Sequence, residues 1–183
     1  MGSSLRATSS DRLSPTAERF SAGIATLSLG IAALSALSVG GALAIEHIGG
    51  VRPCPLCLDQ RIAYYAAIPA ALLAAWLAGR VPAAARVLLA LIAIGFVANT
   101  ALGVYHAGIE WGWWPGPDSC SGMAPIATTP EALRESLRNP AVVRCDAAAL
   151  RVLGISLAGY SALVSALLAV AALTGATQRQ SGR

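Results

Sequence analysis

The 26 residues from Phe20 to Ile45 read FSAGIATLSLGIAALSALSVGGALAI and contain no charged side chain. A helix needs about 20 apolar residues to cross the hydrocarbon core of a bilayer. Three more uncharged runs follow, at residues 62–79, 87–105 and 152–178. All are rich in Ala and Leu, and none alternates apolar with polar residues as a strand would. The runs predict an all-α membrane protein, a bundle of four transmembrane helices.

The first run is about twice as long as the apolar segment of a signal peptide, so we expect it to be retained as a helix. The four runs leave two substantial outer loops and no boundary between domains. We therefore expect a single membrane domain over residues 1–183, with helices at about 20–45, 58–79, 86–106 and 152–176 and outer loops at about 46–57 and 107–151.

The composition supports a chain immersed in lipid. Of its 183 residues, 56% are hydrophobic and only 12% are charged, about half the fraction of charged residues in soluble domains. All 13 basic residues are Arg, and they are scattered rather than gathered in a patch. This distribution argues against a nucleic-acid partner and leaves the lipid bilayer as the surrounding medium.

Arginines near the helix ends indicate the orientation. With the N-terminus inside, seven arginines flank the inner side and six the outer side. Four of the outer six lie in or beside the long 107–151 segment, where the positive-inside rule is weak. We therefore expect both termini in the cytoplasm.

All four cysteines fall in or beside the two outer loops. Cys54 and Cys57 belong to the stretch RPCPLCLDQR, residues 52–61, and Cys120 and Cys145 lie in the second loop. An even number of crossings puts both loops on one side of the membrane. Four cysteines allow three pairings, of which Cys54–Cys57 with Cys120–Cys145 is the local choice.

The spacing in this stretch favours redox chemistry. Pro55 suits the first position of a helix, which makes Cys54 the N-cap. Cys57 then lies in the first turn, where the positive end of the helix favours a thiolate. Arg61 is four residues further on the same face, and an arginine beside lipid is a functional candidate. It could stabilise the Cys57 thiolate or donate to a carbonyl.

A dithiol beside a cation, in apolar surroundings, suits transfer of two electrons from thiols to a lipid-soluble acceptor. A quinone has that character, with two oxygens, a flat ring and an apolar tail. We therefore expect a quinone as the cofactor.

The second loop contains further signals. TTPEALRESLRNP, residues 128–140, predicts a short helix lying on the membrane surface, because Thr128 and Glu131 have the spacing of a capping box. WGWWPGP, residues 111–117, is typical of an interfacial aromatic belt. Asn99 is expected to hydrogen-bond to a neighbouring helix.

Three segments together resemble the disulfide bond formation protein B (DsbB) family, thiol:quinone oxidoreductases of the bacterial inner membrane. The segments are PCPLCLDQR, YHAGIEWGWWPGPDSC and RCDAAALRVLGISLAGY, and the resemblance covers about residues 20–175. It departs from the expected pattern at Gln60, where an acidic residue often stands, and at Leu150, where Trp is expected.

The resemblance implies a relay that carries electrons through both cysteine pairs. Cys120 would form a mixed disulfide with a periplasmic DsbA-like dithiol oxidase, and Cys145 would complete that exchange. Electrons would then reach Cys54–Cys57 by way of a Cys54–Cys145 bridge.

The resemblance also implies a quinone site. Cys57 would react with ubiquinone or menaquinone, Arg61 would polarise a quinone oxygen, and His106 would border the pocket. It further implies that the cysteine loops face the periplasm.

Other readings of the same residues remain open. Paired cysteines also occur in membrane reductases similar to vitamin K epoxide reductase, and they could be static staples in a non-enzymatic scaffold. A zinc site would need four ligands, either all four cysteines or one pair with His47 and His106. We expect no metal, because the neighbouring Arg61 opposes recruitment of a cation. Glu46, Asp59 and Glu110 are expected to face water.

Overall fold

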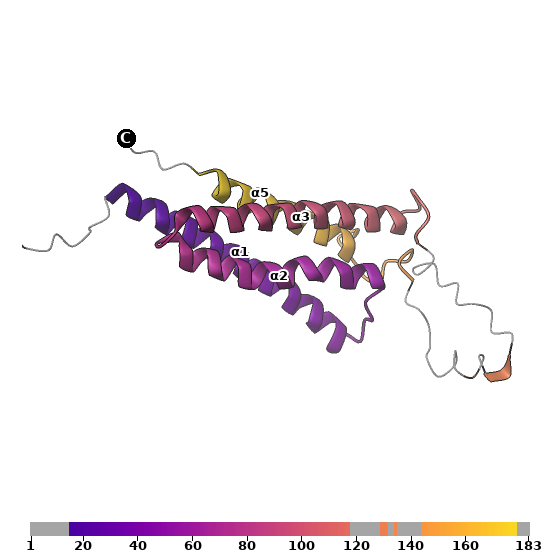
Figure 1. Cartoon of the computed structure of the whole chain (residues 1–183). Helices are drawn as coiled ribbons and strands as arrows, with labels where there is room; N and C mark the ends of the chain where they lie inside the picture. The colour runs from indigo at the N-terminus through magenta and orange to yellow at the C-terminus, as the bar shows by residue number, and fades with distance from the viewer. Residues whose placement is uncertain (1–14, 118–128, 132–133, 135–143, 179–183) are drawn as a thin grey trace, which may run out of the picture.

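A computed structural model of the chain describes residues 15–117, 129–131, 134 and 144–178. Four long helices run side by side in this part of the chain (Figure 1). Each is long and apolar enough to cross a membrane, which confirms the predicted all-α bundle of four membrane-spanning helices. They are α1 (Pro15–His47), α2 (Pro55–Ala78), α3 (Pro82–Glu110) and α5 (Leu157–Thr177).

Two differences from the expected boundaries lie beside the second outer loop. Helix α3 continues past residue 106 to Glu110 and ends before Gly112, whose φ of 72° helices do not adopt. Helix α5 begins at Leu157 rather than near 152 because a small hairpin precedes it. Its strands β1 (Arg151–Val152) and β2 (Ile155–Ser156) pair antiparallel.

The hairpin turns through two residues, Leu153 and Gly154, with φ angles of 52° and 83°. Positive φ at both central residues matches the twist of a two-residue hairpin turn. Ser156 then caps α5 by accepting a hydrogen bond from the Gly159 N–H. The turn and the cap together explain why the apolar run from residue 152 is not helical throughout.

Small residues hold the helices close together. Helix α3 packs most extensively against α5, and α2 packs against both α1 and α3. A Cβ added to Gly103 of α3 would lie 2.9 Å from the Cβ of Ala162 in α5, so these two backbones nearly touch. Such contacts are typical of membrane bundles, where association depends on close packing rather than on hydrophobic burial.

A buried polar cluster links three helices. Asn99 of α3 donates to the Ser165 hydroxyl of α5 over 2.8 Å, and the Tyr64 hydroxyl of α2 lies 2.8 Å from the same oxygen. The interhelical hydrogen bond predicted for Asn99 is thereby confirmed. In the apolar interior these groups satisfy one another.

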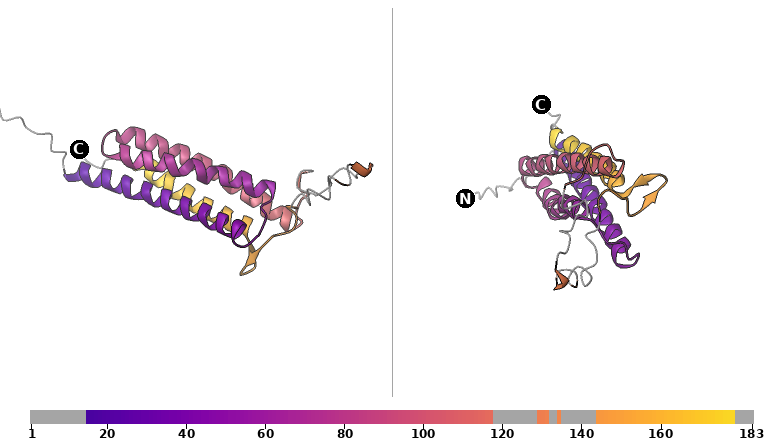
Figure 2. Two further views of the ribbon diagram at one scale, coloured as in Figure 1. Left: turned by 90° about the horizontal axis from the view of Figure 1, so that it is seen from below. Right: turned by 90° about the vertical axis from the view of Figure 1, so that its right-hand side faces the viewer.

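The chain segments that carry Cys54, Cys57 and Cys145 lie at one end of the bundle. Two further views agree that the end of α1, the start of α2, the end of α3 and the β1–β2 hairpin gather there (Figure 2). The start of α1 and the end of α5 lie at the opposite end. Cys120 and most of the predicted surface helix, residues 128–140, lie outside the described residues.

Candidate functional site

The first turn of α2 holds two free thiols. Cys54 is the N-cap, with φ −78° and ψ 166°, and its sulfur accepts from the Cys57 N–H at 3.4 Å. Pro55 opens the helix, as its fixed φ allows, so the cap predicted from the sequence is confirmed. The two sulfurs are 3.1 Å apart. A disulfide bond is about 2.05 Å long, so about 1 Å of movement would close it.

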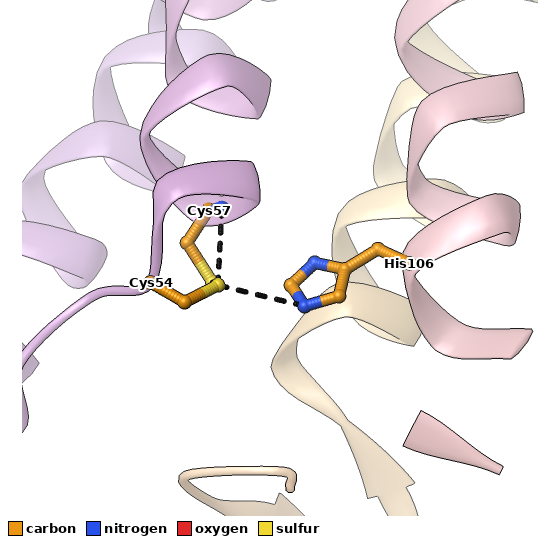
Figure 3. Close-up of side chains that lie close together, drawn as sticks. All are labelled: Cys54, Cys57 and His106. Atoms are coloured by element: carbon orange, nitrogen blue, oxygen red, sulfur yellow. Dashed lines mark hydrogen bonds between the residues drawn. The ribbon is translucent and has the colours of Figure 1, made fainter. Parts of the chain in front are cut away.

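His106 reaches this dithiol from α3. Its Nε2 lies 3.5 Å from the Cys54 sulfur (Figure 3). On the other side of the ring, Nδ1 is 2.8 Å from the side-chain nitrogen of Gln60. His106 and Gln60 are only 1% and 3% exposed. A buried imidazole held from both sides has a fixed orientation, with Nε2 directed at the thiol.

The electrostatics favour a thiolate on Cys54. The hydrogen bond from the Cys57 thiol is the largest of the effects that lower the pKa of Cys54 from 9.0 to about 4. His106 and the Cys57 N–H lower this pKa further, and burial opposes them. Sequence reasoning favoured Cys57 as the thiolate because of its place in the first turn. The structure instead directs the described donors at the cap residue. In a pair this close, the first proton to leave belongs to both sulfurs, and the remaining charge is best stabilised on Cys54.

Arg61 has a carboxylate partner. Its guanidinium donates to Glu46, at the end of α1, with N and O 2.5 Å apart. The side chains are 14% and 27% exposed, so the pair lies at the edge of the protein interior. The sequence suggested a bond from Arg61 to the Cys57 thiolate, whereas the observed partner is Glu46, which was expected to face water.

Glu110 is the site residue that sequence reasoning missed. It was expected to face water, but its side chain is only 5% exposed and its Oε1 is 3.9 Å from His106 Nε2. Its Oε2 is buried and makes no hydrogen bond in the described part of the chain, and the same holds for Oε1 of Gln60. The prediction about Glu110 is wrong because α3 runs one turn further than expected and turns this residue inward. The four-residue spacing in YHAGIE was the available signal.

A cavity of about 330 Å³ opens beside the dithiol. Cys54, Cys57, Arg61, His106 and Glu110 contribute its polar wall. Apolar residues of α1 and α5 form much of the rest, among them Leu37, Val39, Ala42, Ile45, Ala158 and Val164. Such a mixture suits a flat ligand with few polar atoms and an apolar tail.

The other candidate residues are placed as follows. Cys145 is 1% exposed, takes part in a disulfide, and packs in one small apolar cluster with Cys54, Leu56 and Ile109. His47 is exposed, and its Nδ1 lies 3.0 Å from the Leu43 carbonyl of its own helix.

The donor atoms of Cys54, Cys57 and His106 all lie within 4.8 Å of one another, close enough to share a metal ion.

The chain matches known proteins over most of its length. The family model "Disulfide bond formation protein DsbB" matches residues 25–175. Disulfide bond formation protein B of Ralstonia nicotianae is 30% identical over 146 residues, covering 78% of this chain and 87% of that protein. Uncharacterized protein RP370 of Rickettsia prowazekii is 26% identical over 146 residues, covering 79% and 83%. No solved structure matches the chain.

Proposed function

Because the chain belongs to the disulfide bond formation protein B family, whose members are multi-pass inner-membrane oxidoreductases of disulfide formation, we propose that it is a thiol:quinone oxidoreductase. In this proposal it reoxidises a periplasmic DsbA-like dithiol oxidase and passes the electrons to a membrane quinone. The cysteine loops face the periplasm, and both termini lie in the cytoplasm.

The observation that carries the proposal is the free dithiol of Cys54 and Cys57 on the wall of an apolar cavity. A cavity of about 330 Å³ lies at the lower end of the usual range for small ligands. It suits a quinone ring whose tail leaves along the apolar residues of α1 and α5. Ubiquinone and menaquinone share this chemistry. A bound quinone would accept two electrons and two protons.

Three residues of the polar wall take part in the proposed reaction. Cys57 is the thiol that reacts with the quinone. Arg61, oriented by Glu46, donates to a quinone oxygen and stabilises its negative charge. His106 borders the quinone and lies against the Cys54 sulfur, where it can hold or release the proton of that thiol.

The second cysteine pair connects this site to the partner protein. Attack by a thiolate of the reduced dithiol oxidase on Cys120 forms the mixed disulfide and releases Cys145 as a thiolate, and the second thiol of the oxidase later resolves the mixed disulfide. The Cys145 thiolate then attacks the Cys54 sulfur of the oxidised Cys54–Cys57 pair, which forms a Cys54–Cys145 bridge and leaves Cys57 as the thiolate that faces the quinone. The shared apolar cluster of Cys54 and Cys145 supports this route.

The test is quinone reduction by the purified full-length protein in detergent, with a reduced thioredoxin-like dithiol oxidase as electron donor. The quinone absorbance is followed. We expect turnover by the wild type, none by Cys57→Ala, and a severe loss for Arg61→Ala. The exposed carboxylate Asp59, which is absent from the cavity wall, gives the control variant Asp59→Asn, and this variant should match the wild type.

Cys120→Ala separates the two halves of the relay. It should still pass electrons from a pre-reduced Cys54–Cys57 pair to quinone, but it should not turn over the partner. Normal turnover of the partner by Cys120→Ala would refute the relay. If the wild type reduces no quinone and its disulfides do not change, the disulfides are structural and the protein is a non-enzymatic scaffold.

A further inference from the structure

The reduced dithiol and His106 have the arrangement of a metal site. Their three donor atoms lie within 4.8 Å of one another. Tetrahedral zinc, with bonds of about 2.3 Å to sulfur and about 2.0 Å to nitrogen, places sulfur and nitrogen about 3.5 Å apart. The Cys54 sulfur and His106 Nε2 are separated by 3.5 Å. The sulfurs, 3.1 Å apart, would have to open by about 0.7 Å to reach tetrahedral spacing.

The surroundings of His106 also fit a ligand histidine. Such a histidine usually donates its other ring N–H to an acceptor that fixes the ring. Gln60 is 2.8 Å from Nδ1, and its Oε1 is buried and makes no described hydrogen bond. Turning the amide by half a rotation, which exchanges its oxygen and nitrogen, would let Oε1 accept from Nδ1–H and leave Nε2 free for the metal.

Glu110 can supply the fourth ligand. One carboxylate oxygen is 3.9 Å from His106 Nε2, and the other is buried without a described hydrogen bond. A tetrahedral ion would bring the oxygen to about 3.3 Å from that nitrogen, a shift within the reach of a side-chain rotation. A carboxylate buried in this way is stabilised by a cation.

Two arginines of the cavity wall are paired with carboxylates. Arg61 is paired with Glu46, and Arg144, also on the cavity wall, is paired with Asp146. Glu46 therefore offsets the charge of Arg61, the arginine that was expected to oppose a metal ion here.

We propose that Cys54, Cys57 and His106, completed by Glu110, form a binding site for Zn²⁺ that exists only while the Cys54–Cys57 pair is reduced. Binding replaces the two thiol protons by two sulfur–zinc bonds and moves no electron. A disulfide offers no thiolate, so the oxidised protein does not bind. If the chain is a thiol:quinone oxidoreductase, the ion holds the dithiol reduced and stops electron flow at this step.

The experiment uses full-length protein in detergent, anaerobic and free of quinone. The parent carries Cys120→Ala and Cys145→Ala, so that only one dithiol remains. Co²⁺ serves as the spectroscopic probe, because sulfur-to-cobalt charge-transfer bands report thiolate ligation. The affinity for Zn²⁺ is then measured by competition with a chromophoric chelator. We expect one tightly bound ion in the reduced parent and none after oxidation.

Variants identify the ligands. His106→Ala should weaken Zn²⁺ binding by about 100-fold or more, and Gln60→Leu and Glu110→Gln by about 10-fold each, as is typical for groups that orient or complete a site. The control Asp59→Asn should have no effect. Circular dichroism checks that each variant is folded, and Gln60→Leu keeps the test decisive should His106→Ala fail to fold.

Equal Zn²⁺ affinity in the parent, His106→Ala and Gln60→Leu would overturn the proposal, because the dithiol alone would then bind the ion. Charge-transfer bands of equal strength in reduced and oxidised protein would overturn it too. None of these measurements requires quinone reduction, so they stand even if the proposed oxidoreductase activity is absent. Where activity is present, Zn²⁺ should slow quinone reduction by the reduced parent and leave Glu110→Gln less sensitive.

Discussion

Replacing Glu46 by glutamine removes the charge that holds Arg61 in place. A hydrogen bond to a charged group contributes about 1.5–3 kcal/mol, and the partial exposure of the two side chains, 14% and 27%, screens the pair. We therefore expect Glu46→Gln to lower the free energy of unfolding by about 1–2 kcal/mol. In a protein of this size that corresponds to about 5 °C in the melting temperature. Thermal unfolding of the purified protein in detergent measures it.

A double-mutant cycle with Arg61→Gln isolates the pair. Because the two side chains are paired, the double variant should lose less stability than the two single variants together, by about 1 kcal/mol. Quinone reduction should also fall in Glu46→Gln, because Arg61 would no longer be oriented, while Asp59→Asn should retain both activity and stability. Single effects that add to within about 0.3 kcal/mol would refute the reasoning that Glu46 positions Arg61.

Three further changes test the bundle and the dithiol. Gly103→Val places side-chain atoms where a Cβ alone would meet Ala162 at 2.9 Å, so it should separate α3 from α5 and destabilise the fold by about 1–3 kcal/mol, seen as a lower melting temperature. Ser165→Ala removes a hydroxyl bonded from two other helices and should cost about 1–2 kcal/mol by the same measurement. Because the folded pKa of Cys54 is lowered to about 4, its thiolate stabilises the reduced protein fully above about pH 9, and that stabilisation is lost as pH falls through about 4. The free energy of unfolding of the reduced protein, compared with that of the oxidised protein, should therefore rise as the pH rises from about 4 to about 9. If both free energies changed with pH in the same way, the prediction would be contradicted.

The membrane bundle was predictable because its cause is local in the sequence. Each run long enough to cross the hydrocarbon core must satisfy its own backbone hydrogen bonds, and a helix does so within one segment. The N-cap at Cys54 was predictable for the same reason, since Pro55 fixes where the helix can start. The hairpin before α5 was not, because a turn with Leu153 at positive φ runs against the usual preference of that residue.

Of the partners around His106, Glu110 left a signal in the sequence, its four-residue spacing in YHAGIE, but the approach of Cys54 and Gln60 from another helix did not. Helices that are apolar on all sides carry little information about their rotation around the long axis. Which residues of neighbouring helices face each other therefore depends on close contacts such as Gly103 of α3 against Ala162 of α5. Only after α2 and α3 are packed does Gln60 meet the imidazole, whereas Glu110 lies one turn from His106 on the same helix. The role given to Cys120, by contrast, is inferred from the resemblance to the family alone.

The described thiols, His106 and Glu110 all sit at one end of the bundle, and this location has an energetic consequence. Moving one elementary charge across the hydrocarbon costs or yields about 2.3 kcal/mol per 100 mV of membrane potential. A reaction that takes electrons and protons from thiols and delivers both within the same leaflet carries no net charge through that field. The driving force of the proposed thiol:quinone reaction is therefore independent of the membrane voltage.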